Sequence, residues 1–257
     1  MKKWLRIALD VALSLGVFAG AWMLRTVTSN AFVTWDEPAW VFRSVKFLSA
    51  LSRGDWAGTL ITGHPGVLTM WSGALGLLWH RTISGFVSPQ QLASVAAMPA
   101  LEVHDPQIIR QLVALLPAAK TGICASHALI ALALFWLIKG LLDRRHALVG
   151  VSVILLDPYY LALSRVLHID ALASGLMLAS VLSLLLYVRR GSRRHLIVSG
   201  LAAGSAALTK SYAGLLVPLT VLVVISVQIW GCPTKAGRGG RATWRSATVG
   251  ALRDTLL

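Results

Sequence analysis

The residues best suited to chemistry begin with a pair of adjacent carboxylates, Asp36 and Glu37, in the motif Trp35-Asp36-Glu37-Pro38. An amphipathic stretch follows, so one of the two carboxylates should stand at a helix N-terminus, where the helix dipole keeps it ionised. An ionised carboxylate can accept the proton of an attacking hydroxyl or amine. A simple helix cap is the alternative interpretation.

Three further motifs supply a histidine, a second carboxylate and two cations. His64 stands between Gly63 and Pro65, just before an apolar block. Arg165 and Asp170 lie in a stretch that joins two further blocks, and Lys210 follows another block. Ionisable groups near membrane depth usually face a cavity, and cations there stabilise charge that develops on a phosphate leaving group. A turn histidine, an Arg165–Asp170 ion pair and a snorkelling lysine are the alternatives. Together the set fits group transfer from a lipid phosphate.

The composition predicts that these residues lie in a membrane protein. The chain has 257 residues, 56% hydrophobic and 13% charged, whereas soluble domains carry about 25% charge. Its mean hydropathy is +0.70. No metal-ligand spacing, Gly-rich phosphate loop or nucleophile elbow is present, so we expect that no cofactor is required, with a divalent cation as the alternative. Cys124 and Cys232 should lie at different membrane depths, which disfavours a disulfide.

Seven apolar blocks could provide membrane spans. The second is only 14 residues long and contains Gly73 and Gly76, so we expect it to lie in the interface or to re-enter, which leaves six crossings. The blocks are Ile7–Leu24, Gly66–Trp79, Leu112–Ile138, Ala147–Leu163, Ala171–Val188, Leu196–Thr209 and Ala213–Trp230.

The net charge is +14, and the distribution of the basic residues along the sequence predicts the orientation of the chain in the membrane. Bases cluster before the first block, after the third and fifth blocks and in the C-terminal tail, and such clusters are typical of cytoplasmic segments, so nucleic acid is not expected as a partner. Residues 25–111 then form an extracytoplasmic loop. Seven of the ten acids then lie on the extracytoplasmic side: Asp36, Glu37, Asp55, Glu102, Asp105, Asp157 and Asp170.

The predicted fold is all-α, a polytopic transmembrane helical bundle with a large extracytoplasmic first loop that contains interfacial helices. Residues 1–230 should form one transmembrane module, and residues 231–257 a basic, disordered cytoplasmic tail. The N-terminus should be cytoplasmic in a multi-pass protein of the cell membrane, with the active site on the extracytoplasmic side.

The ordered set of motifs resembles the polyprenyl-phosphate-sugar-dependent glycosyltransferases of the GT-C fold, which include protein O-mannosyltransferases and aminoarabinose transferases. It covers roughly Trp4 to Trp230 and comprises an Asp-Glu in the first outer loop, a His-Pro, an Arg-rich turn, an Asp-Pro/Ser-Arg/Asp stretch and a Leu-Thr-Lys. His-Pro-Gly stands here where His-Pro-Pro is commoner, and residues 81–111 form a longer connection than the family's.

The resemblance implies a lipid-linked sugar donor, a protein, lipid or glycan acceptor, and usually inversion at the sugar. Asp36 looks like the catalytic carboxylate with Glu37 as its neighbour, and Asp170 looks like the second site carboxylate. His64 lies where relatives place a His or Lys near the donor phosphate. The same comparison makes Arg165 and Lys210 donor-phosphate or cavity residues.

Two other functions are alternatives. Buried charges and broken helices also suit a transporter or lipid flippase, although paired repeats and midplane charges are not evident. Family members usually continue through several more spans, whereas Trp230 is followed here by a Gly- and Arg-rich segment. The third expectation is therefore a C-terminally short chain: a fragment, a shifted reading frame, an inactive remnant, or a member whose remaining helices are encoded elsewhere.

Overall fold

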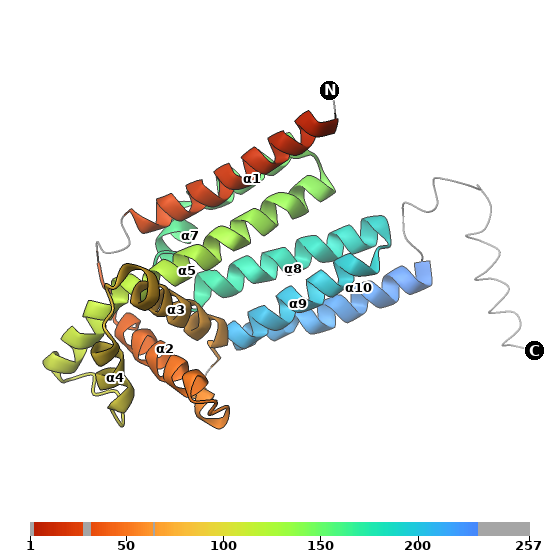
Figure 1. Ribbon diagram of the computed structural model, residues 1–257. Helices are drawn as coiled ribbons and strands as arrows, with labels where there is room; N and C mark the ends of the chain where they lie inside the picture. The colour runs from red at the N-terminus through yellow and green to blue at the C-terminus, as the bar shows by residue number, and fades with distance from the viewer. Residues whose placement is uncertain (1–2, 28–31, 64, 231–257) are drawn as a thin grey trace, which may run out of the picture.

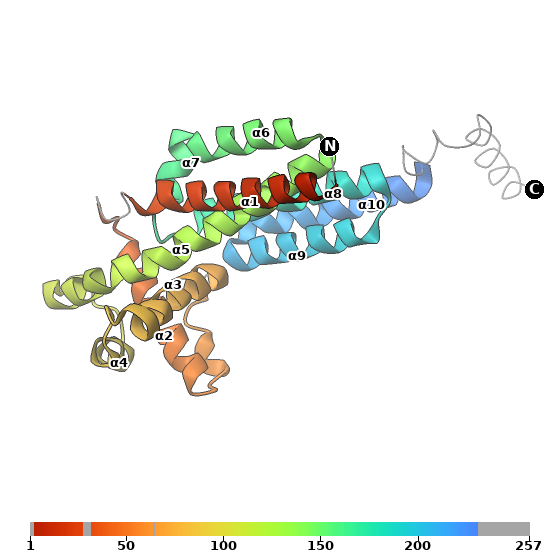
Figure 2. The same cartoon turned by 45° about the horizontal axis from the view of Figure 1, so that its top comes forward.

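The computed structural model describes residues 3–27, 32–63 and 65–230, and this part of the chain is helical without strands. Its longer helices run in roughly one direction as a bundle (Figures 1 and 2). This confirms the predicted helical membrane bundle. The bundle helices are α1 (Lys3–Thr26), α5 (Pro106–Leu141), α6 (Arg144–Leu156), α8 (Asp170–Arg190), α9 (Arg193–Thr209) and α10 (Leu216–Trp230).

Four segments of the described chain are long and apolar enough to cross a membrane. They are Trp4–Thr26, Pro106–Leu141, Asp170–Arg190 and Ser211–Ile229, the last of which joins the short 3₁₀ helix η3 (Ser211–Leu215) to α10. The other bundle helices, α6 and α9, have 13 and 17 residues. Six crossings therefore stay a prediction.

One predicted block is divided in the structure. The block Ala147–Leu163 was expected to be continuous, but α6 ends at Leu156 and a separate helix, α7, spans Pro158–Leu163. The cause is the Asp157-Pro158 pair. Proline disfavours helical backbone in the preceding residue, and the Asp157 carboxylate caps α7 by accepting a hydrogen bond from Tyr160 N at 2.6 Å.

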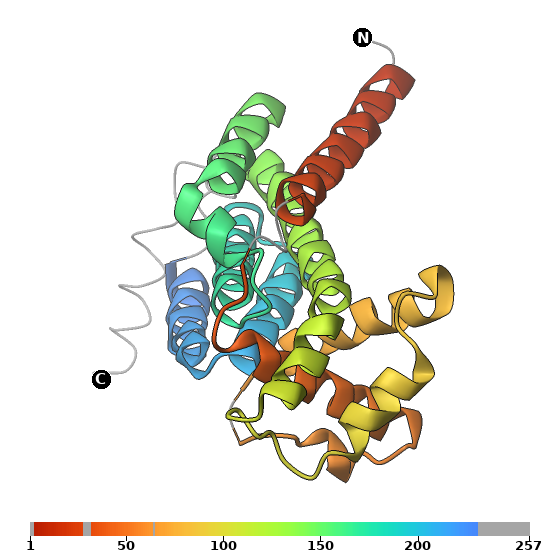
Figure 3. The same cartoon turned by 90° about the vertical axis from the view of Figure 1, so that its left-hand side faces the viewer.

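Three shorter helices gather beside the N-terminal half of α5, at one end of the bundle (Figures 1 and 3). They are α2 (Glu37–Ser52), α3 (Val67–Trp79) and α4 (Pro89–Ala97), with a 3₁₀ turn η1 (Ala57–Thr59) after α2 and a π-helical turn η2 (His80–Ser84) after α3. The α3 helix corresponds to the block expected not to cross. Its 13 residues span about 20 Å, less than the roughly 30 Å of a hydrocarbon core.

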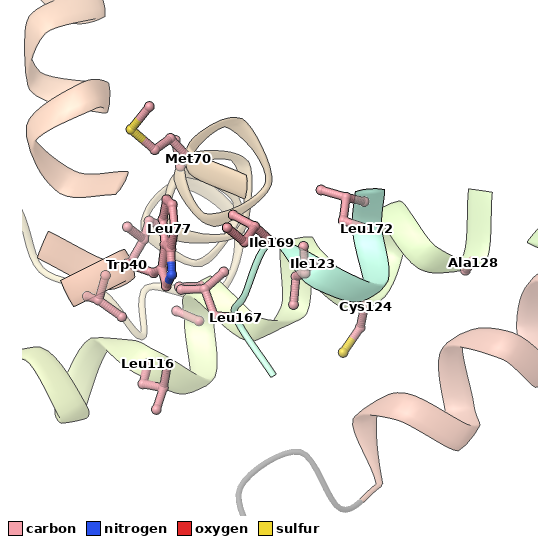
Figure 4. Close-up of a cluster of buried hydrophobic side chains, with 14 of the residues drawn as sticks. Trp40, Met70, Leu77, Leu116, Ile123, Cys124, Ala128, Leu167, Ile169 and Leu172 are labelled. Atoms are coloured by element: carbon pink, nitrogen blue, oxygen red, sulfur yellow. The ribbon is translucent and has the colours of Figure 1, made fainter. Parts of the chain in front are cut away.

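Small residues allow α3 and α5 to approach closely. A Cβ added to Gly122 of α5 would lie 1.9 Å from Ser72 O, and one added to Gly76 of α3 would lie 2.3 Å from Ala118 O. The backbones are therefore in direct contact at these two glycines. The apolar core continues from this contact to Trp40 of α2 and to Leu167 and Ile169 before α8 (Figure 4).

The basic segments lie together at the opposite end of the bundle, where α1 begins and α5 and α8 end (Figure 1). Asp10 of α1 pairs there with Lys139 at 2.6 Å and with Arg144 at 2.8 Å, and Arg190 Nη2 donates to Gly140 O. These contacts join α1, α5, α6 and α8. Which membrane surface this end faces stays a prediction, as do the module boundary at residue 230 and the tail, whose residues lie outside the described ranges.

Candidate active site

Asp36 stands at the N-terminus of α2 with its carboxylate open to solvent. Its side chain is 62% exposed and makes no capping hydrogen bond, although Asp36 is the N-cap residue. The carboxylate borders a pocket of about 320 Å³ that Val33, Thr34 and Trp35 line from one side. Ile109 and Val113 of α5 complete the pocket. The simple helix-cap interpretation therefore does not account for the side chain, which is free to meet a ligand.

His168 lies between the carboxylates of Asp36 and Asp170. Its Nε2 is 3.4 Å from Asp36 Oδ2, and its Nδ1 is 3.5 Å from Asp170 Oδ2. Lys210 forms an ion pair with the other oxygen of Asp170. The Trp40 ring packs edge to face on the imidazole, with a centroid distance of 6.4 Å, and limits its movement. Four polar residues thus form a chain: carboxylate, imidazole, carboxylate and ammonium.

The four polar residues of this row come from three separate segments of the polypeptide. Asp36 precedes α2, His168 and Asp170 mark the start of α8, and Lys210 is the C-cap of α9. Gly66, at the start of α3, donates its backbone N–H to Leu208 O at 2.9 Å and so ties the start of α3 to the end of α9. Turns around one end of the bundle therefore converge on the site.

Arg43 adds a cation one turn beyond Trp40. Its guanidinium lies over the Trp40 ring, with Cζ 4.5 Å from the centroid. Burial lowers the pKa of Arg43, and the negative charge of Asp36 opposes that effect. Arg43 stays charged at any working pH because the guanidinium is intrinsically a very strong base.

Glu37, in contrast, is buried beneath the site. Its Oε1 lies 2.9 Å from Lys120 Nζ of α5, with side-chain exposures of 0% and 1%. The backbone N–H of Thr34 donates to Oε2 at 2.8 Å, and that of Leu167 donates to Oε1 at 3.0 Å. Glu37 therefore fixes the segments just before Asp36 and His168 to α5.

The structure thus brings together Asp36, Asp170 and Lys210 of the predicted residues. Arg165 is half-buried in the turn before α8, and the partners of Asp170 are His168 and Lys210. His64 lies outside the described residues. Among those described, no group of three His, Cys, Asp or Glu side chains could hold a metal ion.

Sequence reasoning missed two residues of this arrangement, His168 and Lys120. Both left a signal. His168 stands two residues before Asp170 in a motif already marked as polar, and Lys120 is an isolated cation within a long apolar block. An isolated charge at membrane depth needs a partner, and the buried Glu37 supplies it.

Comparison with known proteins gives a family match over part of the chain. No curated protein and no solved structure gives a significant match to the chain. Residues 113–235 match the dolichyl-phosphate-mannose-protein mannosyltransferase family, in a region that includes Lys120, His168, Asp170 and Lys210 but not Asp36. The match confirms the resemblance drawn from the motifs over nearly half of the chain, a stretch that is similar to membrane glycosyltransferases of the GT-C type.

Proposed function

We propose that the protein transfers a sugar from a polyprenyl-phosphate donor to an acceptor hydroxyl or amine, with inversion and with Asp36 as the base. The observation that most strongly supports this proposal is the row of polar contacts beside an open pocket. It links the exposed Asp36 through His168 to Asp170 and Lys210. The reaction would take place at the extracytoplasmic surface of the cell membrane, on the side opposite the basic loops. The acceptor would be a protein, lipid or glycan.

The proposed step accounts for the acceptor proton, the bond that forms, the bond that breaks and the leaving group. The acceptor oxygen or nitrogen attacks the anomeric carbon of the sugar while its proton passes to the Asp36 carboxylate. The new glycosidic bond forms as the bond from the anomeric carbon to the phosphate oxygen breaks. The polyprenyl phosphate leaves with the bonding electron pair, on the face opposite the attack, and this geometry inverts the anomeric centre.

The remaining residues hold the ionic state and the geometry of the site. Lys210 faces the charge that grows on the leaving phosphate and exchanges part of its contact with Asp170 for the phosphate oxygens. Arg165 and His64 are proposed as further donor-phosphate residues. Glu37 acts as a positioning residue, since its buried contacts fix the backbone on both sides of Asp36.

The test is sugar transfer by the full chain in detergent with a labelled polyprenyl-phosphate sugar and a panel of acceptors. Asp36→Asn should lower the rate by about 10²- to 10⁴-fold without a change in melting temperature. Asp55→Asn is the matched control, because Asp55 is an exposed carboxylate that caps Gly58 N at 2.8 Å. Full activity in Asp36→Asn would exclude Asp36 as the base. Substrate flux across vesicles without transfer would favour the transporter or flippase.

A further inference from the structure

Arg25, at the C-terminal end of α1, is a buried cation with unused hydrogen-bond donors. Its side chain is 0% exposed. Nη1 donates to Ala21 O of its own helix at 3.0 Å, whereas Nε and Nη2 have no partner among the described residues. A buried guanidinium with unsatisfied donors is costly in free energy. Arg25 can therefore donate further hydrogen bonds to an acceptor that the described residues do not supply.

His127 of α5 adds a buried ring nitrogen without a partner among the described residues, next to Arg25. Its Nδ1 lies 3.4 Å from the Tyr160 hydroxyl, and its buried Nε2 has no partner within the described ranges. If the hydroxyl donates to Nδ1, the imidazole proton resides on Nε2. Both side chains contact the Tyr160 ring, with Arg25 Cζ 5.7 Å and the His127 ring 5.9 Å from its centroid. One aromatic ring thus brings the unused N–H groups of two helices together.

The charge around Arg25 is positive and uncompensated. The titratable groups that interact with it are Arg165, Tyr160, Cys124 and His127, and none of these is a carboxylate. Figure 4 shows Cys124 on the side of α5 turned toward α1. The following residues 28–31 are Thr, Ser, Asn and Ala, which carry no acid. A buried positive region with free donors favours a bound anion.

An apolar groove begins beside this cluster and runs between α1 and α6. It has a volume of about 360 Å³ and is lined by Gly16, Gly20 and Leu24 of α1 and by Leu148 and Leu155 of α6, among others. Leu24 is the neighbour of Arg25, and the α6 side of the groove ends at Leu156, immediately before the turn into α7 and Tyr160. A ligand that fits both features has an anionic head and a hydrocarbon chain.

We propose that Arg25 and His127 bind the phosphate group of a membrane lipid whose hydrocarbon chain lies in the groove between α1 and α6. The phosphate oxygens satisfy the three unused donors and neutralise the buried charge. The position of Arg25 at a helix end suits a lipid head group, while the groove extends along α1 from Leu24 to Ala12. This binding does not depend on sugar transfer.

The first experiment compares three probes on the full chain in a nonionic detergent: dodecyl phosphate, dodecanol and inorganic phosphate. Thermal unfolding and native mass spectrometry report binding, because a ligand that binds the folded state raises the melting temperature. Dodecyl phosphate should bind at least about tenfold more tightly than inorganic phosphate, since its chain adds apolar burial, and dodecanol should give no shift. Equal affinity for the two phosphates would overturn the lipid assignment, as would an equal shift with dodecanol.

Variants then separate the head group from the chain. Arg25→Met should abolish the shift with dodecyl phosphate and raise the melting temperature of the ligand-free protein, because it removes an uncompensated buried charge. Arg25→Lys should retain part of the binding. A purely structural arginine predicts the reverse for Arg25→Met, a lower melting temperature with unchanged binding, and this result would overturn the proposal.

Gly16→Leu tests the groove. A Cβ at Gly16 meets nothing within 4 Å, so the new side chain fits without a clash and occupies the groove. It should weaken dodecyl phosphate binding about tenfold and leave inorganic phosphate binding unchanged. Unchanged dodecyl phosphate binding would contradict the chain position. Arg53→Gln is the control for loss of a cation, because Arg53 is exposed and contacts Ser49 Oγ.

Discussion

Glu37 and Lys120 form an ion pair of 2.9 Å between α2 and α5, with both side chains excluded from solvent. The pair joins residues 83 positions apart, and Glu37 also accepts backbone N–H groups from Thr34 and Leu167. The ammonium in turn donates to Phe32 O at 3.2 Å. The loop before α2, the turn before α8 and α5 are thus held by one carboxylate directly beside the proposed base.

Loss of either partner should therefore be costly. Glu37→Gln leaves the Lys120 ammonium as an uncompensated buried charge, and Lys120→Met leaves the Glu37 carboxylate so. Each variant should lower the free energy of unfolding by about 3–5 kcal/mol. The double variant should lose less than the sum of the two, as denaturant titration in detergent would measure. Asp143→Asn, at an exposed ion pair with His146, is the control. Additive losses in the double variant would show that the pair is not coupled.

Lys210 should act on the donor. We expect Lys210→Met to lower kcat/KM for the lipid-linked sugar by about 10²-fold, because it removes a cation that faces the leaving phosphate. Lys210→Arg should restore part of the activity, and Arg53→Gln should have no effect. Steady-state kinetics with varied donor concentration provide the measurement. A wild-type kcat/KM in Lys210→Met would remove Lys210 from the site.

His168 should act through the two carboxylates that it bridges. His168→Leu should lower kcat by about 10²-fold with little change in donor KM, since a small displacement of a catalytic group has an effect of that size. His168→Gln keeps a polar group near both carboxylates and should recover part of the loss. Equal activity of the Leu and Gln variants would indicate that only the volume of the side chain matters.

Gly66 should be sensitive to a single methyl group. Its φ of 147° is unfavourable for other residues, and an added Cβ would lie 2.2 Å from Trp40 Cη2. Gly66→Ala should lower the free energy of unfolding by about 1–3 kcal/mol and displace Trp40 from His168. Gly63→Ala, where nothing lies within 4 Å of the new atom, should be neutral. A smaller ring in Trp40→Phe should relieve part of the Gly66→Ala loss, and identical losses in both backgrounds would place the strain elsewhere.

Chelation tests the expectation that no cofactor is required. Transfer should be unchanged after EDTA treatment, because the proposed step uses only Asp36 and the cation Lys210. Rate measurements before and after dialysis, with Mg²⁺ and Mn²⁺ returned separately, provide the comparison. Loss on chelation with recovery on one metal would assign a divalent cation to the reaction.

The sequence predicted the helical membrane architecture because long apolar blocks separated by basic turns leave few alternatives. It also singled out Asp36, Asp170 and Lys210, since polar residues beside such blocks are few. It could not predict that Glu37 turns inward to Lys120 while its neighbour Asp36 faces the pocket. Adjacent residues at a helix start differ in exposure only through tertiary packing. The Asp157-Pro158 pair that divides α6 from α7 is plain in the sequence. The apolar residues on both sides of it nevertheless favoured one continuous block.

The 36 residues of α5 form one helix about 54 Å long, well beyond the roughly 30 Å of a hydrocarbon core. Its surplus length carries the packing surface for α2, α3 and α4, while its other end holds Lys139 against Asp10. In the proposed orientation, with the basic end held at one membrane surface, the length of α5 sets the height of Asp36 beyond the opposite surface. A thicker bilayer should then lower the proposed site toward that surface and a thinner one raise it, so we expect lipid chain length to govern which acceptors come within reach.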